Sequence, residues 1–249
     1  MTLLTSIKTI FFLITFLYIA PFLFEGIKKQ YIALLEPRTP IGILHVLNPF
    51  NQTSYFIERL HFFFKNPSIK GIIIKIDCTD IAPGTSHTIF HDIRQLKKMY
   101  PKPIIALIEN TCLAGAYLIA SVCDYIIAPE SAIIGNIGYT FTTIPHYILD
   151  EEHNEMFNDI KNELYQHLTK QIALQRKLLL TTTHSWGDGK IFTGSKAVSL
   201  GLSNEVGSLC AAIRTIKEKA LIEGEIEWIE YNDKTSYSDI FLGNKSTIL

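Results

Sequence analysis

Residues 104–139 hold the side chains whose types and spacing could do chemistry, in the order IIALIENTCLAGAYLIASVCDYIIAPESAIIGNIGY. The β-branched run 104–108 predicts a buried strand, and three small residues, Ala114, Gly115 and Ala116, separate it from a short apolar helix over residues 117–123. A strand, a small-residue turn and a buried helix can present a nucleophile or an oxyanion hole. The same pattern also occurs in the ordinary core of an α/β protein, so the local sequence leaves both interpretations open.

The wider pattern resembles the S49 peptidases, the family of signal peptide peptidase A, SohB and protease IV. Its motif runs small-Ser-Gly-Gly-Tyr, a buried helix, Ala-Asp, a strand and Gly-Ser-Ile-Gly. The residues in register with this motif are Gly115, Tyr117, Ala120, Asp124, Ala128, Gly135, Ile137 and Gly138. A second match covers residues 186–194, WGDGKIFTG, which the resemblance assigns to structural packing. The resemblance covers residues 42–220 and implies the ββα superhelix of the Clp protease/crotonase class.

Three departures from the family pattern fall on its catalytic positions. Ala114 occupies the position of the nucleophilic serine. Asp80 and Ile81 occupy the oxyanion-turn position, where the family has glycines, and a carboxylate there would repel an anionic intermediate. Beyond Gly138 the segment that carries the family's lysine base is missing, and the later lysines are predicted on the solvated face of a helix: Lys161, Lys170 and Lys177.

Cys112 and Ser121 flank Ala114 and are the remaining candidate nucleophiles. Cys112 precedes the turn, so its side chain is expected to point elsewhere, and Ser121 lies two helical turns further on. We expect neither to act. The four cysteines and the histidine-rich stretch around residues 146–167 match no metal-ligand spacing, so the sequence predicts neither a metal nor a cofactor.

Strands and helices alternate along the rest of the chain, which predicts an α/β fold with a largely parallel sheet. The expected strands are residues 42–47, 71–76, 104–108, 125–128 and 228–231. The expected helices are residues 54–65, 88–100, 117–123, 158–180 and 210–221.

The N-terminus predicts a membrane anchor. Residues 10–24 are almost wholly apolar and lie between Lys8 and the pair Lys28–Lys29, a length close to the ~20 residues that span a bilayer. A cleaved signal peptide is the alternative, but no good small-x-small site follows the apolar run. We therefore expect an N-terminal transmembrane helix (1–29), a linker (30–40), the S49-like domain (41–222) and a C-terminal extension (223–249).

The sequence thus predicts a membrane-anchored, catalytically inactive S49 protein that acts as a scaffold or assembly subunit. The expected partners are the membrane, a second copy or an S49 homologue, and peptides, with the body on the extracytoplasmic side of a bacterial inner membrane, as the resemblance implies. The net charge of −1 argues against nucleic acid as a partner. The alternatives are an active S49 serine peptidase with relocated catalytic residues and a crotonase-like acyl-CoA enzyme.

Overall fold

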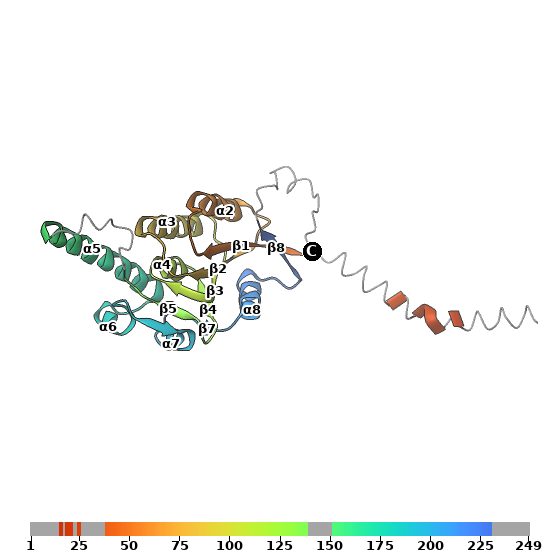
Figure 1. Cartoon of the computed structure of the whole chain (residues 1–249). Helices are drawn as coiled ribbons and strands as arrows, with labels where there is room; N and C mark the ends of the chain where they lie inside the picture. Colours follow the sequence, from red (N-terminus) through yellow and green to blue (C-terminus); the bar gives the residue numbers. More distant parts are fainter. Residues whose placement is uncertain (1–14, 17, 22–23, 26–37, 139–150, 231–249) are drawn as a thin grey trace, which may run out of the picture. The chain divides into compact units, whose positions relative to one another are not determined.

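Runs of β-branched residues form the central strands, and amphipathic segments form the helices that cover them (Figure 1). The computed structural model describes residues 15–16, 18–21, 24–25, 38–138 and 151–230, with side chains from residue 156 onward in the last range. Two units are distinguished, Met1–Arg38 and Thr39–Leu249, and the second contains the sheet. Its strands are β1 (Thr39–Leu47), β2 (Gly71–Cys78), β3 (Ile104–Leu113), β4 (Tyr125–Ala128), β5 (Ile133–Gly135), β6 (Ile191–Thr193), β7 (Glu205–Val206) and β8 (Ile226–Glu230).

Within the described residues these strands form one sheet in the order β6-β5-β3-β2-β1-β8, and β4 pairs with both β3 and β7. All pairs are parallel except β5–β6. On one edge, β3 pairs first with β4 through residues 105–107 and then with β5 through residues 111–113. The carboxyl end of β3 therefore has β2 on one side and β5 on the other.

The helices cover the two faces of the sheet unequally. On one face lie α2 (Thr53–Lys65), α3 (Pro83–Met99), α4 (Gly115–Ser121) and the inner end of α5 (Glu151–Arg176), whose buried residues share a core with alternate residues of β1, β2 and β3. On the other face α8 (Leu209–Ala220) packs Ala212 and Ile216 against Ile41, Ile73 and Ile105. Burying a side chain such as Ile73 contributes about 1.5–3 kcal/mol, so these two cores hold the layers together.

Most predicted elements are confirmed, with corrected bounds where a local signal decides the helix end. α3 begins at Pro83 rather than residue 88, because proline suits the first turn, where a backbone N–H has no partner. α5 ends at Arg176 rather than residue 180, because Lys177 takes a left-handed conformation (φ 56°) and Leu178 N–H donates to Ala173 O at 2.9 Å. The helix predicted over residues 117–123 is α4, displaced by two residues toward the turn.

The ends of the sheet differ from the predicted boundaries. β1 begins at Thr39, inside the predicted linker, and β8 lies inside the predicted C-terminal extension, where it pairs in parallel with β1 from Thr39–Ile226 to Ile43–Glu230. Most of the predicted membrane-spanning segment, residues 10–24, lies outside the described residues. Among the residues that are described, no helix is long and apolar enough to cross a bilayer.

Candidate active site

The turn between β3 and α4 has the conformation expected of a nucleophile-bearing turn. Ala114 has φ 49° and ψ −120°, a conformation rare for a residue with a side chain. Its N–H donates to Gly135 O of β5 at 3.0 Å, and its carbonyl accepts from Tyr117 N–H at 3.1 Å. The hydrogen bond to Gly135 joins the turn to β5 of the sheet, and the hydrogen bond from Tyr117 lies in the first turn of α4. A nucleophilic residue at this position would stand at a sharp strand-to-helix turn, but the side chain present is a methyl group.

Gly115 lets the start of α4 approach the loop after β2. A Cβ at Gly115 would lie 2.6 Å from Ile81 O, closer than real side chains allow, and 3.0 Å from Ser86 Oγ, which is a tight contact. The predicted oxyanion-turn residue Ile81 is thus brought beside the predicted nucleophile position. Its side chain is buried in the core, and the atom it presents closest to Gly115 is a carbonyl oxygen, which accepts hydrogen bonds. An oxyanion hole needs donors.

Asn48, at the end of β1, fixes the loop that carries Asp80 and Ile81. Its Oδ1 accepts from Thr79 N–H at 3.2 Å and from the Cys78 thiol at 3.0 Å, while its Nδ2 donates to Thr79 Oγ1 at 2.9 Å. The Cys78 thiol also lies 3.3 Å from Asp80 O. Asp80 itself is exposed.

The two alternative nucleophiles are enclosed. Cys112 is fully buried, faces Cys78 across the β2–β3 ladder, and has a pKa raised well above the ordinary thiol value by that burial. Ser121 is 1% exposed and its hydroxyl donates to Leu118 O at 2.7 Å. A thiol that stays protonated and a hydroxyl that donates within its own helix are poor nucleophiles.

No described lysine takes the place of a general base at the turn. Lys161, Lys170 and Lys177 are exposed on or just after α5, as predicted. The sequence argument missed Lys102, whose Nζ donates to Phe63 O at 2.8 Å and whose pKa is lowered to about 8 by burial. Lys102 precedes β3 and Ala114 follows it, so the ten-residue strand separates them by about 33 Å. The Lys102 side chain therefore binds a backbone carbonyl at the end of α2 and cannot reach the turn at Ala114.

Asp77 is a second residue that the sequence argument missed. Its carboxylate, at the end of β2, accepts from Asn110 Nδ2 at 2.8 Å and from the Thr111 N–H and hydroxyl at 3.1 and 2.8 Å. The hydrogen bond from Asn110 is the largest cause that lowers the pKa of Asp77. These bonds join the end of β2 to β3 at Thr111, three residues before the turn at Ala114.

The second matched segment, residues 186–194, contacts β5 and the residue that follows it. Asn136 N–H donates to Lys190 O at 2.7 Å, and β5 pairs with β6 of that segment. A Cβ at Gly194 would lie 1.9 Å from Pro129 O, which explains the glycine at this position. Asn204 Oδ1, shortly after this segment, accepts from Ile126 N–H at 2.9 Å and from Arg176 Nη1 at 3.0 Å. These contacts are structural, as predicted for the motif.

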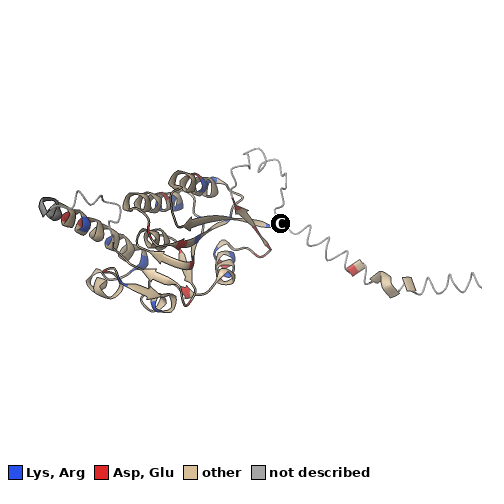
Figure 2. Cartoon of the chain, in the orientation of Figure 1, with Lys and Arg blue, Asp and Glu red and all other residues tan. Residues whose placement is uncertain are grey.

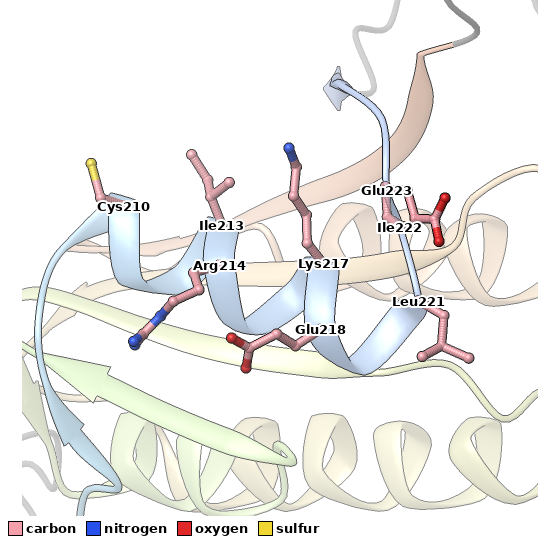
Figure 3. Close-up of a pocket in the computed structure, with 8 residues that line it drawn as sticks. All are labelled: Cys210, Ile213, Arg214, Lys217, Glu218, Leu221, Ile222 and Glu223. Atoms are coloured by element: carbon pink, nitrogen blue, oxygen red, sulfur yellow. The ribbon is translucent and has the colours of Figure 1, made fainter.

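A separate pocket of about 530 Å³ lies on α8 and the residues that follow it (Figure 3). It is lined by Cys210, Ile213, Arg214, Lys217, Glu218, Leu221, Ile222 and Glu223. α8 packs on the sheet face opposite α4, and none of the predicted site residues lines this pocket. It is therefore not part of the candidate active site.

Comparisons with known proteins agree with the family resemblance of the sequence motif. The family model for peptidase family S49 matches residues 97–147 and 144–223, and the two segments meet where the sequence departs from the family pattern. The chain is 26% identical to a Methanocaldococcus jannaschii protein named "Putative protease" over 71% of its own length and 64% of that protein. It is 25% identical to the "Putative signal peptide peptidase SppA" of Enterococcus faecium (89% and 73%) and 24% identical to the chloroplastic serine protease SPPA of Arabidopsis thaliana (91% and 39%). The chain belongs to peptidase family S49.

Proposed function

We propose that this protein is a membrane-anchored S49 family member of Clp/crotonase-like fold that forms no acyl-enzyme and serves as a scaffold or assembly subunit. The observation that carries the proposal is Ala114. The turn keeps the conformation of a nucleophile-bearing turn, with its bonds to Gly135 and Tyr117 in place, but the side chain has no nucleophilic atom. The anchor rests on the apolar run of residues 10–24.

Two further features support an inactive site. The atom nearest Gly115 from the loop after β2 is the acceptor Ile81 O. The lysines on and just after α5 are exposed, and Lys102, whose pKa is lowered, donates to Phe63 O at the far end of β3. The alternative of an active peptidase with relocated residues would need Cys112 or Ser121, both enclosed in the core. Membership of the S49 family stands against the acyl-CoA alternative.

The test is Ala114→Ser, with Ala116→Ser as the matched control inside α4. We expect neither the unmodified chain nor Ala114→Ser to react with a fluorophosphonate probe or to cleave signal-peptide-like substrates. A serine at this position still lacks a general base, which typically contributes 10²–10⁴-fold to the rate. It also lacks the hydrogen-bond donors of an oxyanion hole, one of which is worth about 10²–10³-fold in rate. Probe labelling that appears in Ala114→Ser but not in Ala116→Ser would show that a base and an oxyanion hole are present. Hydrolysis by the unmodified chain would overturn the proposal.

A further inference from the structure

Three leucines are exposed where α5 ends. Leu174, in the last turns of the helix, is 63% exposed, and Leu179 and Leu180, just after it, are 67% and 51% exposed. Ile172 on the same helix is fully buried, and Leu174 points about 200° away from it around the helix axis, so Leu174 cannot join that core. Leucines that gather on a surface in this way mark a place of contact with another apolar body.

The backbone keeps the three leucines in one region. Leu178 N–H donates to Ala173 O at 2.9 Å, a bond that folds the chain back on the last turn of α5. Leu179 and Leu180 therefore follow directly from the end of the helix that carries Leu174. Neither forms part of the buried core.

The charged side chains beside these leucines are lysines. Lys170 lies one helical turn before Leu174 and Lys177 lies three positions after it, so the three side chains share one face. Both lysines are exposed. No Asp or Glu occurs from residue 164 to residue 187, although the chain as a whole has a net charge of −1. We call Lys170, Leu174, Lys177, Leu179 and Leu180 the lysine–leucine patch.

We propose that the lysine–leucine patch docks the body of the protein on an anionic lipid surface. Leucine side chains enter the boundary between headgroups and acyl chains, and the long lysine stems let the ammonium groups reach the lipid phosphates. Each lysine near an anionic membrane strengthens binding roughly fivefold. The lysines on either side of Leu174 therefore place cations at headgroup level while the leucine between them inserts.

The composition of the patch favours lipid over a protein partner. Protein–protein contacts draw most of their binding energy from Trp, Tyr and Arg, and leucine is under-represented among such residues. The patch contains none of these three types. Arg176, the one arginine in this stretch, donates instead to Gly201 O at 3.0 Å and to Asn204 Oδ1 at 3.0 Å.

A patch of this size acts together with a second attachment, because stable membrane binding takes two signals. The proposed N-terminal anchor supplies the second signal and holds the patch close to the bilayer, where docking is an intramolecular step. The inference goes beyond the proposed scaffold role, and it rests on the proposed anchor for its strength. Docking of the patch sets which side of the body faces the membrane.

A fluorophore beside the patch tests the docking in the full chain. Thr181→Cys places a thiol next to Leu180, and Cys210→Ser removes the native cysteine that is exposed, since the other three are buried. The labelled chain is reconstituted into vesicles of phosphatidylcholine, with or without phosphatidylglycerol, that contain a nitroxide-labelled lipid as quencher. We expect strong quenching in the anionic vesicles and little in the neutral ones. Leu221→Cys is the control site, because Leu221 is 89% exposed at the end of α8, and its label should stay unquenched.

Charge and apolarity are then tested separately. Lys170→Gln with Lys177→Gln should lower the ratio of docked to undocked body roughly 25-fold, so quenching should fall to the level of the neutral vesicles. Leu179→Asp should also abolish quenching, because a carboxylate is repelled by the anionic surface. Lys65→Gln with Lys98→Gln is the matched control, since it removes the same charge from exposed positions in the last turns of α2 and α3 and should leave quenching unchanged. Thermal unfolding verifies that each variant is folded.

The outcomes separate the docking from the anchor. A chain that stays with the vesicles through an alkaline carbonate wash, but whose label is unquenched in anionic vesicles, would overturn the docking alone. A chain that the wash releases, but whose label was quenched before it, would overturn the anchor and support the docking.

Two further results would overturn the assignment to lipid. Quenching that is equal in neutral and anionic vesicles, or that survives the two lysine substitutions, would show that the anionic surface is not recognised. A label that is already shielded from water in detergent without lipid would assign the patch to a protein contact.

Discussion

Ala114 has a backbone conformation that its own side chain does not require. A residue with a Cβ at φ 49°, ψ −120° carries strain of about 1–3 kcal/mol, which the bonds to Gly135 and Tyr117 hold in place. The neighbouring polar residues, Asn48 and Asp77, are committed to backbone and side-chain partners that fix the loop and the strand ends. The residues around this turn therefore fix its position, and the side chain at the turn itself is a methyl group.

The strain at Ala114 predicts that glycine stabilises the protein there. Ala114→Gly removes the Cβ from a left-handed conformation, and after the entropic cost of glycine we expect a gain of about 1 kcal/mol in the free energy of unfolding. Ala116→Gly, inside α4 and fully buried, should instead destabilise by about 1 kcal/mol or more. Thermal or denaturant unfolding measures both. Equal losses in the two variants would show that the turn carries no such strain.

Asp77 predicts a pH dependence of stability. Its pKa is lowered below 3.8 in the folded chain, first by the bond from Asn110, so the carboxylate contributes stability above that value and loses it as the pH falls through the folded pKa. We expect Asp77→Asn to be less stable than the unmodified chain at neutral pH and the difference to shrink below pH 3.8. Asp80→Asn, in the next loop, serves as the control. A difference that is the same at pH 7 and at pH 3 would contradict the assignment.

The elements show which parts of the fold a sequence can specify. The β-branched runs of β1, β2, β3 and β4 predicted those strands, because a strand buried on both faces leaves a continuous apolar run. The short strands β5, β6 and β7 carry no such run, since pairing with distant segments defines them. The Asp77 bonds and the Ile81–Gly115 approach escaped prediction for the same reason: both depend on the register between separate strands and loops.

The approach of α4 to the loop after β2 predicts opposite effects at two glycines. Gly115→Ala places a methyl group 2.6 Å from Ile81 O, so α4 or the loop must move, and we expect a loss of about 1–3 kcal/mol. Gly84→Ala in the first turn of α3 meets nothing within 4 Å and should stabilise by about 0.5–1 kcal/mol through helix propensity. Denaturant unfolding distinguishes them. A neutral Gly115→Ala would mean that this contact does not hold the turn.

At the scale of the whole domain, the first and last described strands pair with each other. β8 covers the outer edge of β1, His45 lies 3.7 Å from Glu230, and Trp228 packs on the core beneath α8. Figure 2 shows positions of Lys and Arg interspersed with those of Asp and Glu along the helices in this view. The edge of β1 is thus paired with β8, whose residues the sequence analysis placed in the C-terminal extension.

This closure predicts that a chain ending at Gly224 will be unstable. Without β8 the apolar strand β1 becomes an unpaired edge, and we expect loss of cooperative unfolding and a tendency to aggregate. A chain ending at Glu230 keeps every described strand and is the control. Light scattering and thermal unfolding compare the two. A well-folded monomeric domain ending at Gly224 would show that β8 contributes little.

The pairing of β1 with β8 also sets an order in time. During synthesis β1 leaves the ribosome almost 190 residues before its partner, because Thr39 pairs with Ile226. Translation adds about 5–20 residues per second, so the nascent chain carries an open β-edge for roughly ten seconds or longer. That interval exposes an apolar strand while every other central pair can already form. The last described strand to be made therefore ends the period in which a chaperone, or a second nascent chain, can bind this edge.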